Sequence, residues 1–163
     1  MEGNPCLKVL VADDSPDYAD TTALLVRCWG HEVEVAYTGT DALAKADAFH
    51  PDAMLLDIGM PGMTGYAVAE EVRRRPHLHG TTLIAVTAYG DDEARARSKR
   101  AGFDLHLVKP VEPAVLEKML NLVGLTKELF AEEERTVGHP AAVKHRAALL
   151  QEQVRLGGGR GDY

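Results

Sequence analysis

The chain has 163 residues, of which 45% are hydrophobic, and 25 acidic against 18 basic side chains give it a formal net charge of −7. This length predicts one domain with a modest appendage. The acidity argues against sequence-independent nucleic-acid binding, which needs clustered positive charge. No stretch approaches the roughly 20 apolar residues that span a bilayer, and the N-terminus lacks a signal-peptide pattern. We therefore expect a cytoplasmic protein without membrane insertion.

Two cysteines, Cys6 and Cys28, lie far apart in the sequence. Two such residues make neither a disulfide framework nor a zinc-binding spacing. They are therefore predicted to be free, buried thiols.

Short apolar runs alternate with helical patterns along the first two thirds of the chain. Leu7–Ala12 predicts a buried strand, and Ser15 and Pro16 then suit the N-cap and first position of a helix. One face of this helix is expected to carry Tyr18, Leu25, Cys28 and Trp29. Later patterns predict strands at Val33–Tyr37, Ala53–Leu56, Leu83–Val86 and Leu105–Val108, and helices at Thr40–Phe49, Gly65–Arg75, Asp91–Ala101 and Leu116–Val123. The helix at Asp91–Ala101 has few large apolar residues and is expected to pack lightly.

Five β–α units with continuous apolar strands predict an α/β fold, with a parallel sheet covered by helices on both faces. Right-handed crossovers leave few topologies, and the flavodoxin-like, doubly wound order 2-1-3-4-5 is one of them. After Gly124 the composition becomes more polar. We expect one domain at residues 1–124, a helical extension at 125–156 and a disordered tail at 157–163.

The extension contains two polar helical patterns, Thr126–Glu134 and Ala141–Leu156, which Gly138-His139-Pro140 separates. A narrow apolar stripe in the second is made of Val143, Ala147, Leu150 and Val154. This stripe predicts either a homodimerisation or docking helix, or a helix that folds back on its own domain. The extension is too short and too polar for a DNA-reading or cyclase domain.

Reactive side chains follow four of the predicted strands. Asp13 and Asp14 come after the first strand, Asp57 after the third, Thr87 after the fourth and Lys109 after the fifth. The carboxyl ends of parallel strands line one edge of the sheet, and ligands bind there at the point where the strand order reverses. The order 2-1-3-4-5 brings the three acids together at that point, with the hydroxyl and the ammonium on the far side.

Three close carboxylates repel one another, so they must shift their pKa values or bind a cation. An all-oxygen site with room for water suits Mg²⁺, or Mn²⁺ as a substitute. One oxygen of Asp57 would then remain free to attack phosphorus, as in aspartyl-phosphate enzymes. Lys109 and the metal would neutralise the phosphoryl oxygens, and Thr87 would donate a hydrogen bond to one of them.

The segments VLVADDS, AMLLDIGMPGMTGY, LIAVTAYG and AGFDLHLVKPV closely resemble receiver domains of two-component response regulators, between about Leu7 and Val123. The last segment is most similar to receivers attached to hybrid sensor kinases. The resemblance implies that Asp57 is the phosphoacceptor. It also implies a stand-alone phosphorelay protein that is phosphorylated by a sensor histidine kinase or histidine phosphotransferase and then switches a surface for a downstream protein partner.

The same resemblance assigns the remaining site residues. Mg²⁺ would be held by Asp14, Asp57 and the backbone carbonyl of Gly59, with Asp13 acting through water. A phosphoryl group would contact Thr87, the backbone of Ala88 and Lys109, whose bond to Pro110 is expected to be cis.

Four positions depart from, or vary within, the family pattern. His106 stands where receivers most often carry the Tyr or Phe that moves with Thr87, so it is either a switch residue or a partly exposed imidazole at a strand edge. Gly59 and Tyr89 occupy positions that tune the lifetime of the phosphoryl group. Thr64 replaces the usual Asp or Asn before Gly65, a tolerated change in the turn.

Two other functions are kept as alternatives. The first is a phosphohydrolase with an aspartyl nucleophile, although such enzymes carry Asp-x-Asp after the first strand, whereas Asp13 and Asp14 are adjacent. The second is a receiver fold that binds proteins without being phosphorylated. The complete set of Asp, Thr and Lys favours a phosphoacceptor signalling domain, with at most self-phosphorylation and autodephosphorylation as enzymatic activity.

Overall fold

The computed structural model describes residues 3–137 and 142–157, with side chains described at 3–131 and 148–155. Strands and helices alternate as expected. The strands are β1 (Lys8–Ala12), β2 (Glu32–Ala36), β3 (Ala53–Leu56), β4 (Thr82–Thr87) and β5 (Leu105–Val108). The helices are α1 (Pro16–Cys28), α2 (Gly39–Phe49), α3 (Gly65–Arg74), the 3₁₀ helix η1 (Pro76–Leu78), α4 (Asp92–Ala101), α5 (Pro113–Val137) and α6 (Ala142–Gly157).

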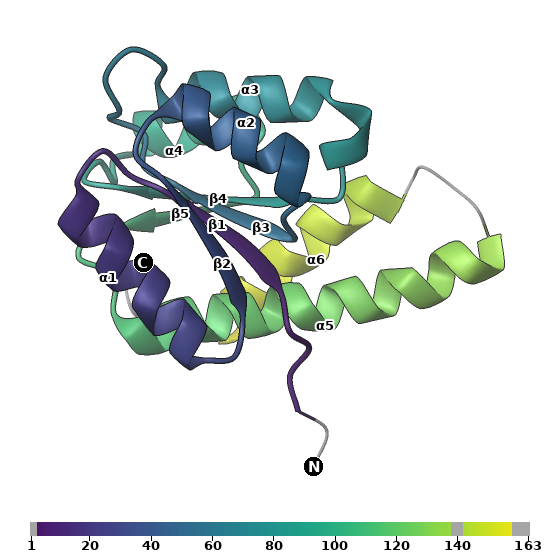
Figure 1. Cartoon of the computed structure of the whole chain (residues 1–163). Helices are drawn as coiled ribbons and strands as arrows, with labels where there is room; N and C mark the ends of the chain where they lie inside the picture. The colour runs from purple at the N-terminus through teal and green to yellow at the C-terminus, as the bar shows by residue number, and fades with distance from the viewer. Residues whose placement is uncertain (1–2, 138–141, 158–163) are drawn as a thin grey trace.

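The five strands form one parallel sheet in the order β2-β1-β3-β4-β5, which confirms the predicted doubly wound topology. Helices α2, α3 and α4 cover one face, and α1 and α5 cover the other (Figure 1). Every residue of β3 and β4 is buried because these central strands have neighbours on all sides. The edge strand β5 instead alternates buried with half-buried residues.

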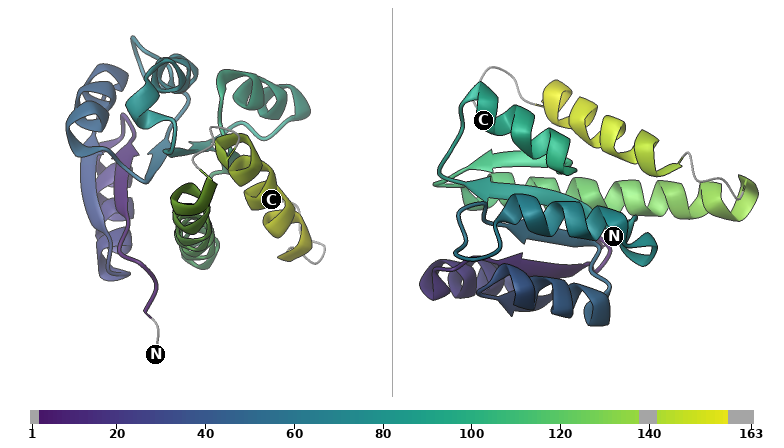
Figure 2. Two further views of the ribbon diagram at one scale, coloured as in Figure 1. Left: turned by 90° about the vertical axis from the view of Figure 1, so that its right-hand side faces the viewer. Right: turned by 90° about the horizontal axis from the view of Figure 1, so that it is seen from above.

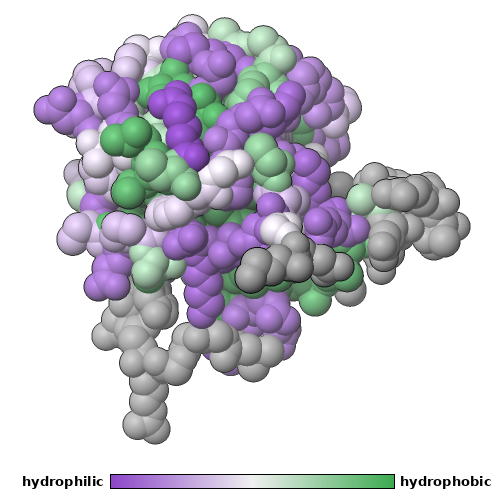
Figure 3. All heavy atoms as spheres, turned by 60° about the horizontal axis from the view of Figure 1, so that its bottom comes forward, coloured by the Kyte–Doolittle hydropathy of each residue, from purple (hydrophilic) through white to green (hydrophobic). Residues whose placement is uncertain are grey.

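Side chains of each strand alternate between two hydrophobic cores, as the two-residue period of a strand requires. On β1, Leu10 and Ala12 join the core under α2 and α3, whereas Val9 and Val11 join the core under α1 and α5. On the surface that comes forward in Figure 3, hydrophobic residues lie in groups separated by hydrophilic ones.

The predicted buried face of α1 was wrong in part. The buried residues are Ala19, Ala23 and Val26, whereas Cys28 is exposed. Positions 26 and 28 differ by about 200° around a helix axis, so burial of the first turns the second towards solvent. Cys6 is also exposed. Both cysteines are free as predicted, but neither is buried.

The helix predicted to end near Gly124 continues without a break as α5 to Val137, so the separate helix expected to begin at Thr126 is absent there. Gly124 serves a close approach instead of a helix end, because a Cβ on it would lie 2.8 Å from Pro5 Cγ. The first part of the continuation still packs against the domain, since Thr126 and Phe130 are buried. Lys127 Nζ also lies 2.7 Å from a carboxylate oxygen of Asp52, just before β3.

The second helix of the extension is confirmed as α6, which Leu150 anchors as a buried residue. Val143 and Ala147 of the predicted stripe lie outside the described side chains, as do the predicted break at 138–140 and the tail at 158–163. Within the described part of the chain, no helix is both long enough and apolar enough to cross a membrane.

Candidate functional site

Backbone hydrogen bonds fix the residues that follow the strands at one edge of the sheet. The amide of Asp57 donates to the carbonyl of Ala12 over 2.9 Å, so the pairing of β1 with β3 continues past the end of β3. The amide of Lys109 similarly donates to the carbonyl of Thr87 over 2.8 Å. The predicted acids, hydroxyl and ammonium therefore share this edge, and the Lys109–Pro110 bond is cis as expected.

Three carboxylates gather at the centre of this edge. One oxygen from each of Asp13, Asp14 and Asp57 lies within 4.8 Å of the other two. Asp13 and Asp57 are buried, whereas Asp14 is exposed. Three carboxylate oxygens, open to water on one side, are the donors that Mg²⁺ prefers, so these residues fit that ion.

Lys109 balances part of this negative charge. Its Nζ donates to Asp13 Oδ2 over 2.7 Å, lies 3.7 Å from Asp57 Oδ1 and sits 4.2 Å from the centre of the Tyr18 ring. Burial lowers the pKa of Lys109, but the hydrogen bond to Asp13 and the charge of Asp57 outweigh it, so the pKa is raised overall. Lys109 is therefore a cation at neutral pH.

Asp57 remains under strong repulsion despite this cation. Burial and the charge of Asp13 raise the pKa of Asp57, and the charge of Lys109 opposes them only in part. One added positive charge would relieve this repulsion. Lys109 neutralises only part of the negative charge of the three carboxylates, so the site fits a divalent cation.

The comparisons with known proteins agree with this geometry. The response regulator receiver domain family matches residues 9–121. The chain belongs to this family. Protein PilH of Pseudomonas aeruginosa is 31% identical over 71% of this chain and 96% of its own. The histidine-protein kinase BarA of Escherichia coli is 30% identical over 73% of this chain, but only 13% of BarA is covered.

Solved structures also support membership of the receiver family. Chemotaxis protein CheY4 of Vibrio cholerae superposes with a TM-score of 0.70 and 34% identity, covering 73% of this chain and 99% of CheY4. Receiver domains are signalling domains of two-component systems that interact with histidine kinases or phosphotransferases and with downstream targets. Residues 122–137 of α5 and all of α6 lie beyond the matched range.

A chain of hydrogen bonds leads away from Thr87 in this receiver. The buried Thr87 accepts from the amide of Tyr89 at Oγ1 over 3.2 Å. The carbonyl of Tyr89 lies 2.7 Å from His106 Nε2, and Ser98 Oγ lies 2.8 Å from His106 Nδ1. A carbonyl only accepts, so Nε2 carries the proton and Nδ1 accepts from the serine hydroxyl. His106 is thus a half-buried imidazole on the edge strand β5, and both of its ring nitrogens are engaged in hydrogen bonds.

Two contributors were missed by the sequence analysis. Tyr18 was assigned only to the helix face, yet its ring lies beside the Lys109 ammonium. Ser98 received no role, yet it is buried and holds His106. Tyr18 and Lys109 are distant in sequence, whereas Ser98 on α4 and His106 on β5 are close in sequence but belong to different elements. Spacing along the chain carries no signal for either contact.

Lowering the pH should destabilise this receiver partly through His106. Burial lowers the pKa of His106 below 6.5, and the charge of Arg95 adds to this, while the Tyr89 carbonyl and Asp91 oppose it. The unfolded chain therefore takes up this proton first, and stability falls as the pH drops from about 6.5 through the lowered pKa. Urea unfolding at pH 7.5, 6.5 and 5.5 should show a smaller loss for His106→Phe than for wild type. His31 is common to both proteins and cancels, so equal losses would contradict this assignment.

Proposed function

We propose that this receiver accepts one phosphoryl group on Asp57 from a phosphohistidine of a partner kinase or phosphotransferase. The observation that carries the proposal is the meeting of Asp13, Asp14 and Asp57 within 4.8 Å, with Lys109 beside two of them. A carboxylate oxygen of Asp57 forms the bond to phosphorus as the phosphorus–nitrogen bond of the donor breaks. The leaving imidazole takes the electron pair of that bond and a proton.

We propose that Asp14, Asp57 and the backbone carbonyl of Gly59 hold Mg²⁺, or Mn²⁺ in its place, with Asp13 acting through water. When bound, the ion supplies positive charge to the transferring phosphoryl oxygens. The raised pKa of Asp57 supports the assignment, because burial and the charge of Asp13 leave this carboxylate poorly neutralised.

Three residues around Asp57 would contact the phosphoryl group. Lys109 would share its ammonium between Asp13 and the phosphoryl group, since it already lies 2.7 Å from the one and 3.7 Å from Asp57. Thr87 would donate its hydroxyl proton to a phosphoryl oxygen, and the amide of Ala88 would donate to another. Both donors would act on charge that develops during the transfer.

Two residues are proposed to set the lifetime of the phosphoryl group. Among the described residues, none beyond its two neighbours has an atom within 4 Å of the place that a Cβ of Gly59 would take, so water would meet no side chain there. Tyr89 is 63% exposed, so in this conformation it gives the site little cover. Both features favour rapid hydrolysis.

The output is proposed to be a change in the surface of α4, β5 and α5 that a downstream protein recognises. Movement of Thr87 towards the phosphoryl group would disturb its contact with the amide of Tyr89, and through Tyr89 the bond to His106. The lightly packed α4 buries only Ser98 and Ala101 among its residues, so it can respond to such a shift. The acidic composition of the chain favours a protein partner over a nucleic acid.

The proposal is tested by incubating the full chain with acetyl phosphate and measuring its intact mass. With Mg²⁺, the mass should increase by one phosphoryl group in a labile adduct. With Mg²⁺ removed by EDTA, the adduct should fall at least about tenfold, because the charge of the transferring group is then not neutralised. Absence of an adduct at saturating Mg²⁺ would support the protein-binding module instead. Turnover of p-nitrophenyl phosphate would support the phosphohydrolase.

A further inference from the structure

Helix α6 lies along the open edge of the sheet, beside β5 and against α5, with α4 on its other side (Figure 2). The strand order leaves β5 as an edge strand. Exposed edges invite pairing with other chains, and proteins often cover them with a helix. In this receiver α6 provides such a cover.

The seat of α6, by which we mean its contact with β5 and α5, involves few of its described side chains. Leu150 is only 1% exposed and joins the same core as Leu105, Leu107 and Met119. Gln151 Nε2 donates to the backbone carbonyl of Asp104 over 3.1 Å. Of the other side chains described on α6, at 148–155, only Val154 is partly buried. Leu150 and the side-chain amide of Gln151 therefore account for most of the described contact between α6 and the rest of the receiver.

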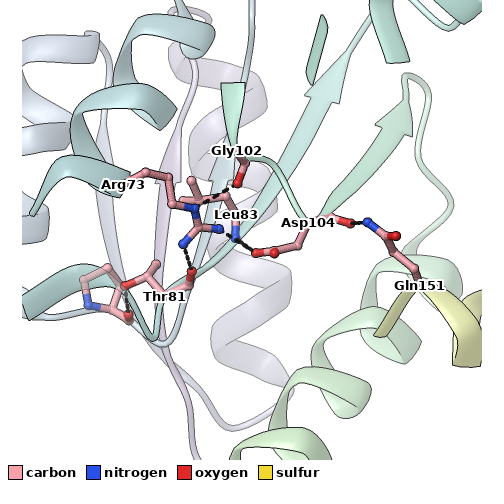
Figure 4. A network of polar contacts seen from close by, with 7 residues as sticks. Arg73, Thr81, Leu83, Gly102, Asp104 and Gln151 are labelled. Carbon is pink, nitrogen blue, oxygen red and sulfur yellow. Dashed lines mark hydrogen bonds and ion pairs between the residues drawn. The ribbon is translucent and has the colours of Figure 1, made fainter. Parts of the chain in front are cut away.

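The anchor of Gln151 belongs to a rigid network (Figure 4). Asp104 Oδ2 accepts from Arg73 Nη2 and from the amide of Leu83, each over 2.8 Å. Arg73 also donates to the carbonyls of Gly102 and Thr81, each over 2.9 Å. The carbonyl that Gln151 contacts is thus held in place at the start of β5 by residues of α3 and β4.

The groove between α6, α4 and β5 is otherwise loosely filled. A cavity of about 290 Å³ lies between α6, α4 and β5, and its lining includes Ser98, His106, Met119, Gln151 and Val154. His106 therefore borders the same space as two residues of α6. Through its bond to the Tyr89 carbonyl, it is also connected to Thr87 at the candidate phosphorylation site.

We propose that α6 is a reversible cover, docked on α5 and β5 in the unphosphorylated receiver and released when Asp57 is phosphorylated. This inference rests on the proposed function, because phosphorylation drives the release. Thr87 and Tyr89 shift, His106 and Ser98 rearrange in the cavity, and the seat of Leu150 and Val154 loses its fit. Release uncovers the apolar surface around Leu105, Leu107 and Met119 for a partner.

Hydrogen–deuterium exchange of the full chain tests the proposal, with Mg²⁺ alone and with Mg²⁺ plus beryllofluoride as the phosphoryl mimic. Amides at 142–157 should exchange at least about tenfold faster with the mimic, the mark of a shifted docking equilibrium. In Asp57→Asn the mimic should change nothing. Amides at 57–65 report binding of the mimic directly, so an unchanged rate there would count against the proposed function. Slower exchange at 57–65 together with an unchanged rate at 142–157 would overturn only the cover.

Two neighbouring leucines supply matched variants. Leu150→Asp places a charge at the buried seat and should release α6 with or without the mimic, while phosphoryl uptake from acetyl phosphate shows that the receiver is still folded. Leu149→Asp makes the same change at a side chain that is 36% exposed and should leave α6 docked and responsive. If exchange at 142–157 in folded Leu150→Asp matches wild type without the mimic, Leu150 does not seat the helix and the proposal is wrong.

Discussion

Asp57→Asn should abolish phosphoryl uptake, leaving less than about one part in a hundred of the wild-type adduct after incubation with acetyl phosphate and Mg²⁺. The amide has nearly the shape of the carboxylate but lacks the anionic oxygen that attacks phosphorus. Asp13 and Asp14 remain, so the site is still acidic, and the loss would mark Asp57 itself as the acceptor. Intact mass measured over a time course gives the result.

Asp17→Asn is the matched control. It makes the same chemical change at an exposed carboxylate in the first turn of α1. Uptake should stay within about twofold of wild type, because Asp17 is not part of the carboxylate cluster. Persistent uptake in Asp57→Asn would move the acceptor elsewhere, and equal loss in both variants would point to a general effect of charge.

Asp57→Asn should also make the metal-free protein more stable than wild type. Burial and the charge of Asp13 raise the pKa of Asp57, so its ionised form opposes folding at neutral pH, and the neutral amide removes that cost. The advantage of Asp57→Asn in urea unfolding should shrink as Mg²⁺ is added, since the ion neutralises the wild-type site. A wild type that is the more stable protein without Mg²⁺ would contradict this account of the site.

The positions of the functional residues could be predicted because a rule of topology turns a linear pattern into a spatial one. Asp13, Asp57 and Lys109 each come directly after a predicted strand, and in a parallel sheet all such strand ends lie at one edge. The helix predicted at Gly65–Arg75 is likewise present as α3, and its buried residues Gly65, Val68, Ala69 and Val72 have the spacing of one helix face.

What could not be predicted depends on side-chain contacts between different elements of the fold. The glycine at 124 resembles a helix end in the sequence, yet it is required by the approach of Pro5. The choice of Asp13 as the partner of Lys109, and of Ser98 as the partner of His106, depends on side-chain geometry across the fold. The seat of α6 depends on Leu150 reaching a core that is built by β5 and α5. No spacing rule covers such contacts.

Gly65→Ala should destabilise the receiver by about 2–4 kcal/mol, as substitutions that force backbone apart do. Helix α3 begins directly against the backbone that follows β3, and a Cβ on Gly65 would lie 2.4 Å from the carbonyl oxygen of Asp57 and 2.8 Å from Ile58 Cα. Neither atom can rotate away, because both belong to the main chain. The amide of Gly65 also donates to the carbonyl of Ile58 over 2.9 Å, which holds the two segments together. Urea unfolding at neutral pH measures the loss.

Gly59→Ala is the control for stability, because it adds the same methyl group in the loop before α3, where no described atom beyond the two neighbouring residues lies within 4 Å. Its unfolding free energy should stay within about 0.5 kcal/mol of wild type. Gly65→Ala should also take up the phosphoryl group more slowly than wild type, under conditions in which the variant is still folded. The reason is that the new Cβ can be accommodated only if the backbone of Asp57 moves. A Gly65→Ala protein that is as stable and as quickly phosphorylated as wild type would show that α3 can withdraw without disturbing the acceptor. The acceptor would then depend on β3 alone for its position.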